Sequence, residues 1–72
     1  MEVYYAAKNG TRIGDLHQTK NGAIKDLIYF LEYKERGMTS VGINIIVEDI
    51  KHKGWFNNWG PNYEIKSEKI LE

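Results

Sequence analysis

The Asn9-Gly10 pair lies between two runs of mixed apolar and polar residues, Glu2–Lys8 and Thr11–His17. Asparagine and glycine both accept the positive φ angles of a two-residue type I′ turn, so the pair predicts a β-hairpin. A two-residue loop also fixes the register of the two strands and places Lys8 opposite Thr11. The same register predicts three further pairs: Ala6 with Ile13, Tyr5 with Gly14, and Val3 with Leu16.

The segment between Thr19 and Gly37 has the periodicity of one amphipathic helix. Its apolar residues recur at the i, i+3, i+4, i+7 spacing that places them on one helix face. They are Ile24, Leu27, Ile28 and Leu31, flanked by Ala23 and Phe30. Thr19–Asn21 supplies candidate N-cap residues, and Arg36-Gly37 supplies a cationic last turn followed by a glycine stop.

Two later segments alternate between apolar and polar residues and predict strands. Ser40–Ile50 is rich in β-branched residues, and Tyr63–Ser67 alternates in the same way. The more apolar face of the first of these strands carries Val41, Ile43, Ile45 and Val47. Ile70 and Leu71 break the alternation, so a bulge, a turn or an ordered tail should follow the last strand.

These elements predict a single α+β domain over residues 1–72, with the order β-β-α-β-β. One helix would pack on a mostly antiparallel four-stranded sheet with the strand order 2-1-3-4, through a right-handed crossover. Residues 54–63 would then form the long connection between strands three and four. The predicted core consists of Val3, Tyr5, Leu16, Ile24, Leu27, Ile28, Leu31, Ile43, Ile45 and Val47.

A chain of 72 residues buries only a thin core, and this one has no cysteine for a disulfide or a thiolate zinc site. Ten basic and ten acidic residues cancel, so charge alone favours neither nucleic acid nor a membrane. We see no secretion signal and expect a cytoplasmic protein. The abundance of Ile, Lys, Asn and Tyr hints at a low-GC bacterium or one of its phages.

Catalysis is poorly supported by the residues that could perform it. Ser40 and Ser67 do not lie in a nucleophile elbow. His17 lies two residues from Asp15 and could face Glu2 across the hairpin, whereas His52 lies between two lysines that disfavour its protonation and metal binding. We therefore expect no enzyme activity, no cofactor and no metal site.

The aromatic segment, Gly54–Tyr63, is the most unusual part of the chain. It contains both tryptophans of the protein among turn-forming Gly, Asn and Pro residues. Its rings could close one end of the core or form a binding surface, and the neighbouring lysines resemble those of single-strand binders. The candidate binding residues here are Lys51, Lys53, Trp55, Phe56, Trp59 and Tyr63.

The outer face of the predicted helix is a second candidate surface. Tyr29 and Tyr33 lie opposite the apolar stripe, between Lys25 and Arg36. Exposed tyrosines beside arginine are typical of interface hot spots. They could equally be solvated, or pack against the C-terminal Ile70-Leu71 pair.

Together these features predict a non-enzymatic binding module that acts through contacts with another protein. The alternative is a single-stranded nucleic-acid binder that uses residues 51–63. One helix can cover only one side of a sheet, so the other side should expose an apolar patch. That patch would contain Tyr4, Ala6, Ile13, Ile46 and Ile50. The aromatic segment or a second copy of the chain should cover it, and we favour a homodimer.

Overall fold

The computed structural model of the chain describes residues 1–35 and 37–70, which form two helices and one four-stranded sheet. The elements and their bounds, in chain order, are β1 Glu2–Lys8, β2 Thr11–Arg12, α1 Lys20–Tyr33, α2 Ser40–Lys53, β3 Trp55–Phe56 and β4 Tyr63–Lys69. The fold is α+β, as the sequence predicts. The predicted order with one helix is wrong, because a second helix takes the place of the third strand.

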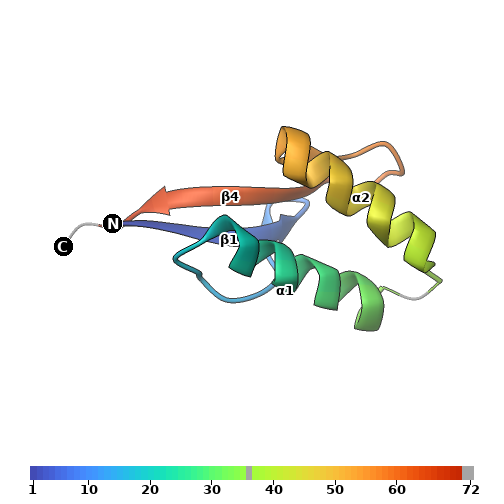
Figure 1. The fold of residues 1–72 in the computed structure, drawn as a ribbon, viewed down its shortest axis with the longest axis horizontal. Coiled ribbons are helices and arrows are strands. Elements are labelled where there is room, and N and C mark those ends of the chain that lie inside the picture. The colour runs from blue at the N-terminus through green and yellow to red at the C-terminus, as the bar shows by residue number, and fades with distance from the viewer. Residues whose placement is uncertain (36, 71–72) are drawn as a thin grey trace.

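The protein has two layers, a sheet and a pair of helices that pack on the same face of it (Figure 1). Strands β1 and β4 form the centre of the sheet, and they pair antiparallel from Glu2 with Lys69 to Lys8 with Tyr63. The short strands β2 and β3 flank them, so the spatial order is β2-β1-β4-β3. The ends of β1 and β4 nearest the chain termini project beyond the helices (Figure 1).

The β1–β2 hairpin has the predicted turn and the first part of the predicted register. Asn9 and Gly10 have φ angles of 51° and 84°, as a type I′ turn requires, and Lys8 pairs with Thr11. Farther from the turn the register changes, because Tyr4 forms a bridge with His17. Two predicted pairs are therefore wrong: Tyr5 with Gly14, and Val3 with Leu16.

Asp26 of α1 explains this change of register. Its Oδ2 atom accepts a hydrogen bond of 2.9 Å from the backbone N–H of Asp15 and lies 2.6 Å from Nε2 of His17. Gly14 approaches the same side chain so closely that a Cβ atom there would be 2.5 Å from Oδ2. The chain after Arg12 thus bends toward α1, and β2 ends.

Helix α1 confirms the prediction made from its periodicity. It begins after Thr19, whose Oγ1 atom accepts a hydrogen bond of 3.2 Å from the backbone N–H of Gly22. The predicted apolar face is turned inward, with Ala23, Ile24, Leu27 and Leu31 buried. Tyr29 and Tyr33 lie on the opposite, exposed face.

The segment Ser40–Ile50 belongs to helix α2, so its prediction as a strand is wrong. Oγ1 of Thr39 caps the helix by accepting a 3.1 Å hydrogen bond from the backbone N–H of Gly42. Gly54 ends the helix in the left-handed conformation, with φ of 90°. The buried apolar residues follow helical spacing: Ile43, Ile46, Val47 and Ile50.

Because α2 lies outside the sheet, β4 occupies the place beside β1 that the third predicted strand would have taken. The predicted strand order is therefore wrong, although the antiparallel arrangement is right. The aromatic segment is not only a connection, because Trp55–Phe56 forms β3 and pairs with β4. The main core cluster lies between the sheet and both helices, whereas Val3 and Ala7 are buried on the opposite face of β1, beside Glu68 and Glu64.

The core differs from the predicted set mainly where the predicted hairpin register and the predicted third strand are wrong. Leu16 and Ile45 were predicted to be buried, but they are 43% and 45% exposed. Ala6, Ile46 and Ile50 were predicted to form an uncovered apolar patch, but they are completely buried. With these three residues buried, the predicted patch no longer favours a homodimer. Besides these three, the core cluster contains Ile24, Leu27, Leu31, Ile43, Val47, Phe56 and Tyr63.

Candidate protein-binding surface

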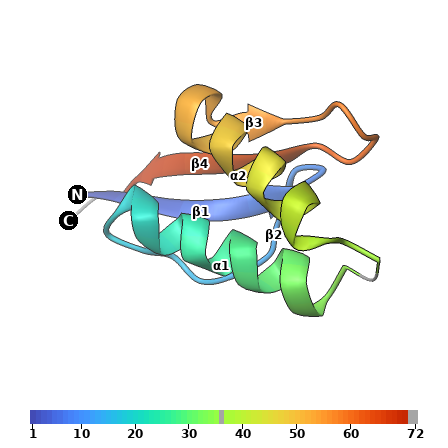
Figure 2. The ribbon, with the colours of Figure 1, turned by 45° about the vertical axis from the view of Figure 1, so that its right-hand side comes forward.

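The two helices diverge along their length. Figure 2 shows them close together where α1 ends and α2 begins, and apart where α1 begins and α2 ends. The wider end leaves a cleft of about 340 Å³ between them. Its lining residues, here called the helix cleft, are Asn21, Ile24, Lys25, Ile28 and Lys51.

The helix cleft combines an apolar floor with positive charge on both walls. Ile24 and Ile28 lie one turn apart on α1, and Ile28 is only partly buried. Lys25 on α1 and Lys51 on α2 are exposed, and neither forms an ion pair with an acidic residue in the described part of the chain. Three other lysines do have acidic partners: Lys8 with Glu35, Lys53 with Asp49, and Lys66 with Glu64.

The outer faces of the helices carry further exposed apolar side chains. The rings of Tyr29 and Tyr33 stack at 4.7 Å between centroids on α1, as their spacing of one turn allows. On α2, Val41 and Ile45 are exposed and line a shallow hollow of about 380 Å³. Its other lining residues are Asn44, Glu48 and Asp49. This hollow therefore has acidic borders, in contrast to the basic borders of the helix cleft.

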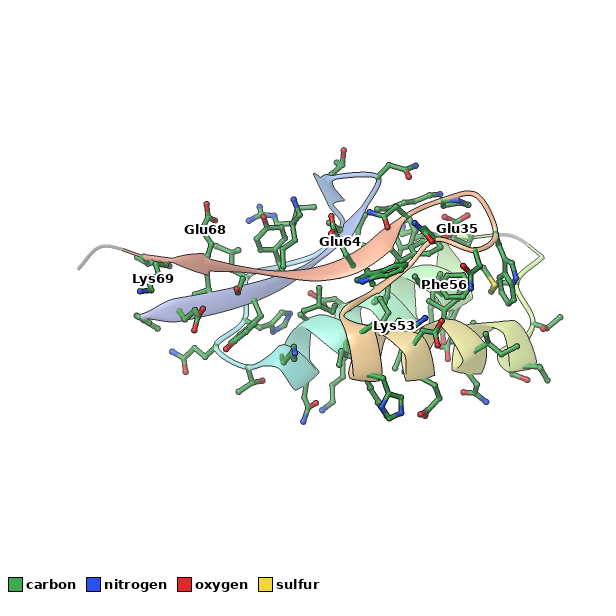
Figure 3. All side chains as sticks on the ribbon, turned by 90° about the horizontal axis from the view of Figure 1, so that it is seen from above. Glu35, Lys53, Phe56, Glu64, Glu68 and Lys69 are labelled. Carbon is green, nitrogen blue, oxygen red and sulfur yellow. The ribbon has the colours of Figure 1, made fainter. Side chains whose placement is uncertain are left out.

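The rings of the aromatic segment separate into a buried and an exposed group. Phe56 and Tyr63 are each only 2% exposed and belong to the core, so they are not accessible to a partner. Phe56 lies between the sheet and the helices (Figure 3). Trp59 packs edge-on against Phe56 with 5.0 Å between centroids and stays half exposed. Phe56 is the buried ring at this end of the core, and Trp59 packs over it and beside Gly42 of α2.

Trp55 lies on the face of the sheet that no helix covers. It pairs with Glu64, and Figure 3 shows Glu64 and Glu68 pointing away from the helices. The ammonium group of Lys53 lies 5.3 Å from the Trp55 ring centroid, in cation–π contact. This face is therefore mixed in charge, with acidic residues beside its one exposed tryptophan.

Lys8, Glu35 and Tyr63 form a polar cluster that joins the sheet to the end of α1. The Tyr63 hydroxyl donates a 3.1 Å hydrogen bond to Oε1 of Glu35, which also contacts Nζ of Lys8. The hydrogen bond from Lys8 lowers the pKa of Glu35. Burial, and then the hydrogen bond to Glu35, raise the pKa of Tyr63 to about 12. The cluster lines neither hollow described above, so we assign it a structural role.

Each of the two histidines lies beside one acidic residue, His17 beside Asp26 and His52 beside Glu48. His17 contacts Asp26 and not Glu2, so the predicted pair across the hairpin is wrong. Within residues 1–35 and 37–70, no three His, Asp or Glu side chains lie close enough to hold a metal ion. Over the same residues, neither helix has the length and apolar character that a bilayer span requires.

The structure thus brings together two candidates that the sequence placed on different surfaces, Lys25 and Lys51. The sequence missed Asn21 and Ile28 as lining residues of a shared cleft, because only the packing of α2 beside α1 creates it. Arg36 lies outside the described residues. Comparisons of the chain with protein-family models, with curated proteins and with solved structures find no match.

Proposed function

We propose that the protein is a small binding module whose helix cleft receives an apolar and acidic segment of another protein. The observation that supports this proposal is the pair Lys25 and Lys51, which line one cleft from two helices and have no acidic partner among residues 1–35 and 37–70. An unbalanced pair of cations beside exposed apolar surface favours a partner of opposite charge. The apolar floor would supply affinity, and the lysines would supply orientation and selectivity.

The exposed side chains around the cleft extend the candidate contact area. A specific interface buries about 800 Å² on each partner, which exceeds what five cleft residues can offer. Tyr29 on α1 and Ile45 on α2 face outward on either side, and aromatic residues often dominate such interfaces. We therefore propose the outer surface of the helix pair as the docking surface, with the cleft at its centre.

Single-stranded nucleic-acid binding remains the second candidate, and the contact of Lys53 with Trp55 is the observation in its favour. Its other proposed residues have other contacts. Lys51 lines the helix cleft, Lys53 is also paired with Asp49, and Trp59 packs on Phe56. Phosphate neutralisation usually dominates nucleic-acid affinity. The two lysines, in a chain of zero net charge, supply little of it.

Site-specific photo-crosslinking in cells of the native host tests the two candidates together. A photoreactive residue would replace Lys25 beside the cleft, Trp55 on the uncovered sheet face, or Glu68 on the same face as a matched control. We expect protein adducts from position 25 and few from position 68. Adducts that form mainly at position 55 and disappear after nuclease treatment would instead establish the second candidate.

A further inference from the structure

We infer that the segment received by the helix cleft is an amphipathic helix with acidic residues along both borders of its apolar face. This inference rests on the proposed function and specifies the partner of the same site. It follows from the backbone of the cleft walls, from the shape of the cleft and from the positions of its charges.

The floor of the cleft offers a partner few free backbone groups. Ile24, Lys25 and Ile28 lie inside α1, where N–H and C=O groups are paired within the helix, and only Asn21 and Lys51 lie in terminal turns. An extended segment bound there would leave its own backbone groups without protein partners, because strand addition needs an exposed sheet edge. A helix pairs its own backbone N–H and C=O groups and presents only side chains to a partner. A helix is therefore the secondary structure that fits this cleft.

The shape of the cleft also suits a helix. Ile24 and Ile28 stand one turn apart and form a ridge of the i, i+4 type along α1. Such ridges pack into the grooves of a neighbouring helix at distances of about 8–10 Å between axes. The cleft of about 340 Å³ lies at the end where α1 and α2 diverge (Figure 2), so a third helix could rest on its open side.

The two lysines of the cleft determine which charge the partner helix should carry beside its apolar face. Lys25 belongs to α1 and Lys51 to α2, so the two cations line the cleft from different helices. A helix between them would place one border of its apolar stripe near each lysine. Glutamate or aspartate on both borders would then pair with both lysines, whereas a basic helix would meet repulsion on both sides.

The test uses three synthetic helical peptides and isotope-labelled full-length protein. The first peptide has leucine on one face and glutamate along both borders, the second has lysine in place of glutamate, and the third has alanine in place of leucine. We expect the first peptide alone to shift backbone amide signals of residues 21–28 and 51 in a saturable way. The charge reversal Lys25→Glu with Lys51→Glu should weaken this binding about tenfold, because two exposed ion pairs become repulsive contacts.

A matched control keeps the net charge change the same. Lys20→Glu with Lys34→Glu alters two exposed lysines outside the cleft, and it should leave the affinity within about twofold of the wild type. Thermal unfolding of each variant would verify that the fold is retained. Equal binding of the glutamate and lysine peptides, or equal loss in both double variants, would overturn the inference.

The failure of this inference can be told apart from failure of the proposed function. If crosslinking from position 25 captures a protein while the glutamate peptide does not bind, the surface is correct and the helical acidic partner is wrong. If position 25 gives no protein adduct and the peptide does not bind, both are wrong. Binding of the alanine peptide as tightly as the leucine peptide would show that charge alone acts, and would refute the helix-in-cleft geometry.

Discussion

Helices α1 and α2 have the same length and the same start, yet only α1 could be predicted from the sequence. Each has 14 residues, and each begins at a threonine whose hydroxyl accepts a hydrogen bond from a glycine N–H three residues later. Both bury apolar residues at helical spacing against the same face of one sheet. Local capping and burial pattern therefore do not distinguish them.

The difference lies in the residue types that form the apolar stripe. The stripe of α1 includes two leucines and an alanine, which favour helices. The stripe of α2 consists of isoleucine and valine, and further apolar residues on its outer face, Val41 and Ile45, add an alternating pattern. One segment thus satisfies two periodicities. Packing against the sheet and α1, which is a long-range effect, selects the helical one.

The largest expected effect comes from removing one core side chain from each helix. Leu27 in α1 and Ile46 in α2 are completely buried, so Leu27→Ala and Ile46→Ala should each lower the free energy of unfolding by about 2–5 kcal/mol. That loss is a large part of the stability of a small domain. Urea unfolding followed by circular dichroism measures both values.

Near equality of these two losses would show that both helices contribute to one core. A loss below about 1 kcal/mol for Ile46→Ala, beside a large one for Leu27→Ala, would contradict the burial of the α2 stripe. Val41→Ala serves as a control, because this side chain is 67% exposed on the outer face of α2. Its free energy of unfolding should change little.

The parts of the fold that the sequence predicts correctly are those set by neighbouring residues. The turn at Asn9-Gly10 and the N-cap at Thr19 depend on local backbone geometry, and both are confirmed. The later register of the hairpin depends on Asp26, which lies on α1. The position of β4 beside β1 depends on α2 leaving the sheet. These last two features require contacts between distant segments, which periodicity alone does not report.

The same distinction applies to the candidate site. Tyr29 and Tyr33 were placed correctly on an exposed face, because helical periodicity fixes which residues lie opposite the core. The approach of Lys25 to Lys51 could not be predicted, because it requires two helices side by side. In the aromatic segment, the burial of Phe56 and Tyr63 could not be predicted either, because it depends on the packing of the helices on the sheet.

The second prediction concerns the C-terminal ends of the helices. The end of α1 is tied to the sheet by Tyr63 and Glu35, whereas α2 ends at a glycine cap. Tyr63→Phe should lower the free energy of unfolding at neutral pH by about 1–2 kcal/mol, because a hydrogen bond to a charged group is lost. The value is expected near the lower limit because Glu35 keeps its contact with Lys8.

The pH dependence of the wild type sharpens this prediction. The pKa of Tyr63 is raised from 10.0 to about 12 in the folded protein, first by burial and then by the hydrogen bond to Glu35. The unfolded chain therefore releases this proton first, so the stabilisation is present below pH 10 and is lost between pH 10 and about pH 12. Chemical denaturation across this range should give a steeper loss for the wild type than for Tyr63→Phe. Parallel curves would contradict the assignment.

The third prediction tests whether the two N-caps are equivalent. Thr19→Ala and Thr39→Ala each remove one hydroxyl that accepts a hydrogen bond from a backbone N–H, at 3.2 Å and 3.1 Å respectively. Each substitution should cost about 1 kcal/mol. Replacement by serine keeps the acceptor and should restore most of the loss. If Thr39→Ala had no effect while Thr19→Ala did, the start of α2 would lie elsewhere.

The smallest expected effect is that of Ile45→Ala, and it distinguishes most directly between a helix and a strand over residues 40–53. Ile45 is 45% exposed on the outer face of α2, where its β-branched side chain gains little from packing and disfavours the helix. Ile45→Ala should therefore change the free energy of unfolding by no more than about 0.5 kcal/mol, and in the stabilising direction if helix propensity dominates. In a strand, the alternation of Ser40–Ile50 would place Ile45 in the core, and the same substitution would cost about 2–5 kcal/mol. Because Ile45 and Ile46 are adjacent and chemically identical, a neutral Ile45→Ala beside a severe Ile46→Ala is the outcome that the helix requires. A severe Ile45→Ala beside a neutral Ile46→Ala would instead show that this segment is a strand.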